Sequence, residues 1–133
     1  MFIKNKKLQD NLGEYLSQMI VNMSSRGPDS AGFAIYDSFE NKKKFKFSLC
    51  IPESININKL VTDIKKKFKD VITKRLSDHL VVTTSSKVKN FKDFIKDYYK
   101  DVTIVGYGHS IEIFKQVGNP TNVVKKFQLH KFK

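Results

Sequence analysis

The sequence predicts an α+β fold with mostly antiparallel strands and helices that cover the sheet. Short runs of alternating or β-branched apolar residues, typical of strands, are interspersed with stretches whose apolar residues recur every three or four positions, typical of helices. Hairpin-like neighbours favour antiparallel pairing, and amphipathic helices need a sheet face on which to bury their apolar side. The 133 residues, 40% of them hydrophobic, are enough for one globular unit with a core.

The first half of the chain is predicted to contain two helices and two strands. Helical spacing of apolar residues predicts a helix over about 8–24 and a longer one over 58–74 with a lysine-rich outer face. A strand is expected at 32–36. Strict alternation over 44–51 predicts a half-buried strand, which we expect to form a hairpin with the strand at 32–36.

The second half is predicted to contain three strands and two helices. A short buried strand, an amphipathic helix, a β-branched strand and an antiparallel return strand are expected at 79–84, 91–98, 102–107 and 110–117. The sequence Gly106-Tyr107-Gly108 is expected to form the turn between the last two strands. A final helix is expected to begin with Asn119 as its N-cap and Pro120 in its first position.

The net charge of +12 raises the question of nucleic-acid binding, because clustered basic residues neutralise phosphates. Of the 25 basic residues, however, only Arg26 and Arg75 are arginine, the residue suited to bidentate phosphate and base contacts. The lysines fit a biased composition as well as they fit a polyanion site. We therefore expect a basic, solvated surface and no nucleic-acid partner.

The cysteine and histidines show no spacing typical of a metal site, and no cofactor or metal is expected. Cys50 is the one cysteine, which excludes an internal disulfide, and its strand position predicts a small packed side chain. His79, His109 and His130 are widely spaced and are predicted to be surface or hydrogen-bonded core groups. No apolar run approaches the roughly 18 residues that span a membrane, so a cytoplasmic location without membrane contact is expected.

The most informative stretch is MIVNMSSRGPDSAGFAIYD, residues 19–37, which reads as a helix, a charged elbow and a strand. Gly27 can take the left-handed conformation that ends a helix, and Pro28 prevents the helix from resuming. Arg26 offers several donors, whereas Asp29 and Ser30 offer acceptors and a hydroxyl. By turn chemistry alone, the elbow reads as an ordinary structural turn.

The run RGPDSAGFAIY resembles the motif that follows the first helix of class II glutamine amidotransferases, the N-terminal-nucleophile hydrolases that release ammonia from glutamine. Residues 2–37 and 102–129 are similar to the small amidotransferase subunit related to glutamate synthase and N-methylglutamate synthase. The resemblance implies that 1–133 is a single, partial domain of this type, with 44–107 a candidate α/β insertion. It also implies glutamine as the substrate and a synthase subunit as the partner that receives ammonia.

The resemblance assigns supporting roles in the glutamine pocket to five residues of the elbow. These residues are Arg26, Gly27, Asp29, Ser30 and Gly32. The family's nucleophile is an N-terminal cysteine whose own α-amine accepts the proton, and this chain begins Met1-Phe2. The family's other glutamine-binding motifs are expected beyond residue 133. The domain therefore reads as incomplete at both ends and is expected to be inactive alone.

Two questions stay open at the level of sequence. The intact elbow motif favours an internal methionine taken as the start of the chain over a decayed gene, and a split gene stays open. The alternative to an amidotransferase is a non-catalytic basic α/β module that binds a protein partner or a nucleic acid. Neither the acceptor of ammonia nor the oligomeric state follows from the residues.

Overall fold

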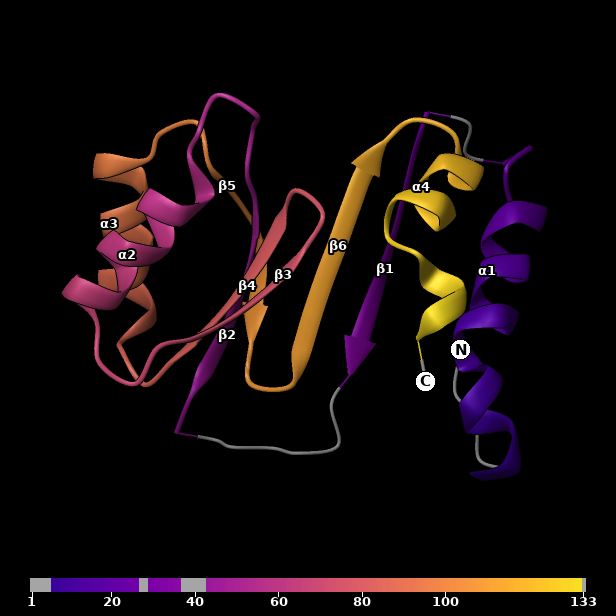
Figure 1. Ribbon diagram of the computed structural model, residues 1–133, viewed down its shortest axis with the longest axis horizontal. Coiled ribbons are helices and arrows are strands. Elements are labelled where there is room, and N and C mark those ends of the chain that lie inside the picture. Colours follow the sequence, from indigo (N-terminus) through magenta and orange to yellow (C-terminus); the bar gives the residue numbers. More distant parts are fainter. Residues whose placement is uncertain (1–5, 27–28, 37–42, 133) are drawn as a thin grey trace. The chain divides into compact units, whose positions relative to one another are not determined.

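A computed structural model describes residues 6–26, 29–36 and 43–132, with the helices and strands labelled in Figure 1. Internal contacts divide the chain into two compact units. The terminal unit comprises Met1–Gly32 and Lys115–Lys133, and the central unit comprises Phe33–Phe114. The predicted α+β class with antiparallel pairing is confirmed.

The central unit contains a four-stranded sheet and two helices. Its complete elements are β2 (Phe45–Cys50), α2 (Ile57–Lys67), β3 (Ile72–Leu76), β4 (His79–Thr84), α3 (Val88–Tyr98) and β5 (Thr103–Gly108). The sheet order is β3-β4-β2-β5 and every neighbouring pair is antiparallel. Strands joined through a helix are thus separated by one inserted strand, which is the split β-α-β arrangement called ferredoxin-like. The candidate insertion 44–107 covers nearly the same residues, although its status as an insertion stays a prediction.

Helices α2 and α3 cover one face of this sheet. Phe47 and Leu49 of β2 are fully buried there, and the Phe47 ring stacks on Phe91 of α3 at a centroid distance of 4.1 Å. The hydroxyl of Tyr99, just after α3, donates to the Asp63 carboxylate of α2 at 2.5 Å. Burial, followed by this hydrogen bond, raises the pKa of Tyr99 to about 12. The helices are therefore held by an apolar core and by this polar link.

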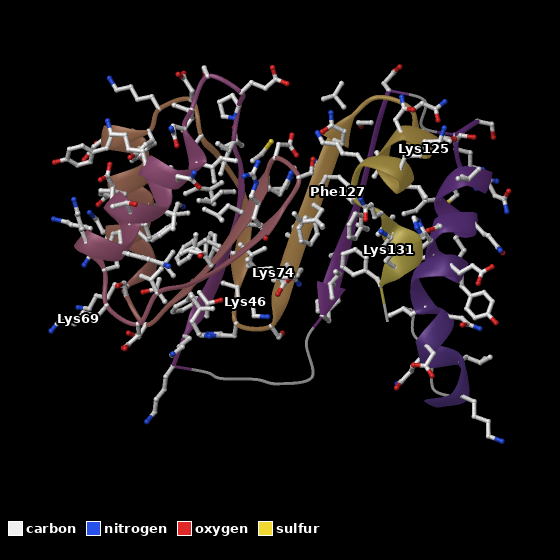
Figure 2. All side chains as sticks on the ribbon, viewed as in Figure 1. Lys46, Lys69, Lys74, Lys125, Phe127 and Lys131 are labelled. Carbon is white, nitrogen blue, oxygen red and sulfur yellow. The ribbon has the colours of Figure 1, made fainter. Side chains whose placement is uncertain are left out.

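The other face of the sheet is also covered within the central unit. The first residues of β6 (Ile111–Val117) contribute this cover, because the Ile113 amide donates to Ser48 Oγ at 2.8 Å. The Glu112 carboxylate binds Lys46 at 3.0 Å and Lys74 at 2.9 Å, and both lysines are labelled in Figure 2. The strand β2 is therefore covered on both faces, and the prediction of a half-buried strand was wrong.

The terminal unit is formed by helical segments from both ends of the chain. These are η1 (Lys6–Asn11), α1 (Leu12–Asn22), α4 (Pro120–Lys126) and η2 (Leu129–Lys131). Helix α1 packs against α4 and η2, and the Gly13 amide donates to the Phe132 carbonyl at 2.9 Å. The predicted start of α4 is confirmed, since the Asn119 side chain accepts from the Thr121 amide at 2.9 Å and Pro120 begins the helix.

Strand β1 (Ser30–Tyr36) pairs with β6 in a two-stranded sheet. The Gly118 amide donates to the Asp29 carbonyl at 2.7 Å in the terminal unit. In the central unit, the rings of Phe33 and Phe114 stack at 5.0 Å. From Asp29 to Phe33 the chain advances by four residues, whereas their partners go back by four residues, from Gly118 to Phe114. The two strands are therefore antiparallel.

Two predicted hairpins were wrong. Strand β1 does not pair with β2, which lies between β4 and β5, and β6 pairs with β1 and not with β5. The residues Gly106-Tyr107-Gly108 continue β5 and do not form its turn. Local alternation identifies a strand, but the choice of partner depends on contacts distant in sequence.

Two helix boundaries were also wrong. The first α-helix covers Leu12–Asn22, and the turn before it is a 3₁₀-helix, so only part of the predicted 8–24 is α-helical. Helix α2 ends at Lys67 and not at residue 74. Asp70 takes a left-handed conformation with φ 53°, after which the β-branched residues that begin with Val71 lead into strand β3.

Candidate functional site

The elbow predicted from the sequence lies between α1 and β1. The chain leaves α1 through a turn in which the Arg26 amide donates to the Met23 carbonyl at 3.0 Å. Strand β1 begins at Ser30. Gly27 and Pro28 lie outside the described residues, so the helix-ending role of Gly27 stays a prediction.

The polar side chains of the elbow are open to solvent. Arg26, Asp29, Ser30 and Gly32 are all exposed, and within the described part of the chain no ion pair joins Arg26 to Asp29. The guanidinium is a planar fork of donors that matches a carboxylate, and Ser30 adds a hydroxyl. The elbow can therefore offer hydrogen bonds to a polar ligand without first breaking an internal ion pair between these two residues.

Backbone contacts position the elbow. The hydrogen bond from Gly118 to the Asp29 carbonyl joins it to the turn between β6 and α4. Gly118 has φ 117°, a conformation that favours glycine, and the following Asn119 caps α4. This anchor was missed from the sequence, because nothing local to RGPDS indicates a partner so far along the chain.

A second group of reactive side chains lies in the central unit. Cys50 at the end of β2 is the register partner of His79 at the start of β4, and Asp78 precedes His79 in the hairpin. The prediction for His79 as a hydrogen-bonded core group is confirmed, since it is fully buried and its Nδ1 lies 2.9 Å from Asp78 Oδ1. Cys50 has no histidine beside it in sequence, so only strand pairing reveals this group.

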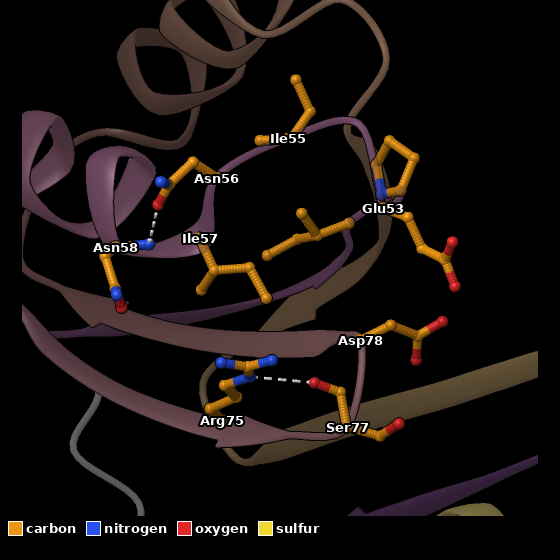
Figure 3. Close-up of a pocket in the computed structure, with 10 residues that line it drawn as sticks. Glu53, Ile55, Asn56, Ile57, Asn58, Arg75, Ser77 and Asp78 are labelled. Carbon is orange, nitrogen blue, oxygen red and sulfur yellow. Dashed lines mark hydrogen bonds between the residues drawn. The ribbon is translucent and has the colours of Figure 1, made fainter.

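A hollow of about 490 Å³ lies beside this group. It is lined by the β2–α2 connection and the β3–β4 hairpin, which contribute the charged residues Glu53, Arg75 and Asp78 (Figure 3). Arg75 Nε donates to the Ser77 carbonyl at 3.0 Å, and Asn56 caps α2 by accepting from the amides of Asn58 and Lys59. The hollow therefore presents both signs of charge on a hydrogen-bonded rim.

The sequence similarity extends over nearly the whole chain. The chain is 36% identical over 131 residues to the glutamine amidotransferase-like protein GlxB of Rhizobium meliloti (strain 1021). The match covers 97% of this chain, so it takes in both units and not the elbow motif alone. It covers 43% of the relative, so the chain spans less than half of that protein's length.

No protein-family model and no solved structure matches the chain. Among the described residues, none of the helices has the length and apolar character needed to cross a membrane.

Proposed function

We propose that this chain is part of a class II glutamine amidotransferase of the N-terminal-nucleophile type. The observation that carries the proposal is 36% identity, over 97% of the chain, to a protein named glutamine amidotransferase-like. The elbow supports it, because the residues of the family motif that the structure describes lie exposed on a backbone turn between a helix and a strand. The proposed substrate is glutamine.

The proposed reaction of the whole protein has three steps. A cysteine thiolate attacks the glutamine amide and forms a glutamyl thioester, ammonia leaves for a partner synthase subunit, and water releases glutamate. Within this scheme the elbow shapes the glutamine pocket. Arg26 supplies a planar pair of donors and Ser30 a hydroxyl, while the hydrogen bond from Gly118 holds the backbone at Asp29 in place.

We propose that the 133-residue chain alone does not hydrolyse glutamine. Cys50 lies in strand β2, so it lacks the free α-amine that an N-terminal nucleophile uses as its base. Purified chain is expected to release no glutamate above a blank. Glutamate release that disappears in Cys50→Ser would contradict this proposal and make Cys50 a nucleophile.

A chimaera tests the role of the elbow. The chain replaces its matching stretch in the relative, and glutamate release is measured for the chimaera and for Arg26→Lys. We expect Arg26→Lys to lower activity about tenfold, the effect of about 1.4 kcal/mol, because lysine does not reproduce the fork of donors. Its melting temperature is expected to stay unchanged, because Arg26 is exposed.

Arg75→Lys is the matched control, since Arg75 is the other arginine and lies in the central unit. It is expected to leave activity unchanged. Full activity of the Arg26→Lys chimaera would remove the role proposed for Arg26. A stable chimaera with no activity, beside an active relative, would argue against the proposed function as a whole.

A further inference from the structure

The inference concerns the Cys50–Asp78–His79 group, which the proposed amidotransferase reaction does not use. One potential ligand atom from each residue, a sulfur, a nitrogen and an oxygen, can be chosen so that all three lie within 4.8 Å of one another. His79 Nδ1 and Asp78 Oδ1 are 2.9 Å apart. Three different donor types, two from the adjacent residues Asp78 and His79 and one from the distant Cys50, thus meet at one end of the sheet.

The backbone around the group is well ordered by hydrogen bonds. Cys50 and His79 are direct partners in the antiparallel β2–β4 ladder. The Ile51 amide donates to the Asp78 carbonyl at 2.9 Å, which joins the hairpin to the residue after Cys50. Ser77 turns the hairpin with φ 56° and accepts from Arg75 at its carbonyl. Ligands carried by paired strands are held more precisely than ligands carried by loops.

The burial of the three side chains is suited to a small bound ion. His79 is fully buried and lies against the ring of Phe114 at a centroid distance of 5.8 Å. The Asp78 side chain is 31% exposed and lines the hollow of Figure 3, and Cys50 is partly buried. Asp78, which lines the hollow and lies 2.9 Å from His79, therefore connects the hollow to the buried histidine.

We propose that Cys50, Asp78 and His79 bind a divalent transition-metal ion of the zinc class. Thiolate, imidazole and carboxylate are all zinc ligands, whereas calcium and magnesium select oxygen atoms. With zinc bond lengths of about 2.0–2.3 Å, tetrahedral ligand atoms are about 3.3–3.6 Å apart. The widest pair of ligand atoms therefore needs to close by about 1.5 Å at most, and the His79–Asp78 pair needs to open by about 0.4 Å, both within reach of rotations of Cys50 and Asp78. Three protein ligands leave a fourth position for water or a further ligand.

Cobalt titration tests the proposal directly. Co²⁺ is added to the reduced, metal-free 133-residue chain, and visible absorption is recorded. One equivalent is expected to give intense tetrahedral bands and a thiolate-to-cobalt band in the near ultraviolet, both abolished by one equivalent of Zn²⁺. Cys50→Ser is expected to lose the thiolate band, and Asp78→Asn to weaken binding at least tenfold. Ca²⁺ and Mg²⁺ are expected not to compete.

Glu53→Gln is the matched control, because Glu53 lines the same hollow but is not one of the three ligands. It is expected to bind cobalt like the parent. No saturable cobalt band in the parent, or Asp78→Asn that binds as tightly as Glu53→Gln, would overturn the proposal. Circular dichroism checks that each variant is folded.

Alkylation gives a second readout that requires no substitution. Cys50 is the one cysteine, so the mass added by iodoacetamide reports on Cys50 alone. One equivalent of Zn²⁺ is expected to slow its alkylation at least tenfold in the folded chain, and a chelator is expected to restore the rate. An alkylation rate that zinc does not change would overturn the proposal, whatever the glutaminase assays give.

Discussion

Gly13 illustrates how one residue limits the packing of the terminal unit. A Cβ added at this position would lie 2.0 Å from the Leu129 carbonyl oxygen and 2.6 Å from that of Phe132. Both are backbone atoms, so no side-chain rotation relieves the clash. Glycine here permits the close approach of α1 and η2, although by helix propensity it costs about 1 kcal/mol relative to alanine.

We therefore predict that Gly13→Ala destabilises the protein by about 1–3 kcal/mol or more, as overpacking does, instead of stabilising the helix. Urea unfolding followed by circular dichroism measures this change. Gln18→Ala, at an exposed position of the same helix, is the control and is expected to change the free energy of unfolding by about 0.5 kcal/mol or less. A Gly13→Ala protein as stable as the parent would show that the chain ends are not packed in this way.

Single residues of the elbow were predictable from sequence only in part. The exposed positions of Asp29 and Ser30 agree with the turn chemistry that placed them there. The hydrogen bond between Asp29 and Gly118 was not predictable, because it depends on which strand β1 chooses as its partner. The proximity of Cys50 and His79 was likewise not predictable, because it depends on the pairing of β2 with β4.

At the scale of elements, periodicity identified most helices and strands but not where each one stops. Val71 and Ile72 continue the helical spacing of α2, so the pattern alone extends the helix through the left-handed Asp70 into β3. In β2, alternation predicted the buried face correctly. It did not predict that Lys46 and Ser48 on the other face are covered by β6, because small or long-stemmed polar side chains can lie at either a surface or a second interface.

The link between β6 and the sheet leads to a prediction about pH. Burial acts to raise the pKa of Glu112, but the hydrogen bonds from Lys74 and Lys46 and the positive charges of these lysines together outweigh it and hold the pKa below its ordinary value of 4.5. Because the native pKa is lowered, the carboxylate stabilises the fold fully at pH values above the ordinary pKa of the unfolded chain. This stabilisation is lost as the pH falls through the native pKa. We predict that Glu112→Gln lowers the free energy of unfolding by about 1–3 kcal/mol at pH 7.

The deficit of Glu112→Gln relative to the parent is expected to shrink as the pH falls below about 4.5, because the parent then loses the same charge. Urea unfolding at pH 7, 5 and 3.5 measures this trend. Glu53→Gln removes an exposed carboxylate and is expected to follow the parent at every pH. A deficit for Glu112→Gln that is the same at pH 7 and pH 3.5 would mean that the charge of Glu112 does not stabilise the fold.

For the whole molecule, the net charge of +12 is the property that most favours the alternative function, a basic binding module. The densest basic segment that the structure describes lies at the end of α2, where Lys65, Lys66 and Lys67 are all exposed and Lys69 follows. Other exposed lysines lie on α3, at Lys89, Lys92 and Lys96. Lysine is a point charge without the planar fork that reads bases, so such a surface attracts polyanions without selecting among them.

We predict that the chain binds duplex or single-stranded nucleic acid only weakly at physiological salt, with a dissociation constant of about 10⁻⁶ M or higher, typical of non-specific binding. Labelled DNA and RNA are titrated by fluorescence anisotropy at two salt concentrations. Changing Lys65, Lys66 and Lys67 to glutamine is expected to weaken the residual binding no more than the same change at Lys89, Lys92 and Lys96, because scattered charges act through their number. Submicromolar, sequence-selective binding that only the α2 triple variant abolishes would instead identify a nucleic-acid site on the central unit and favour the binding module over the amidotransferase.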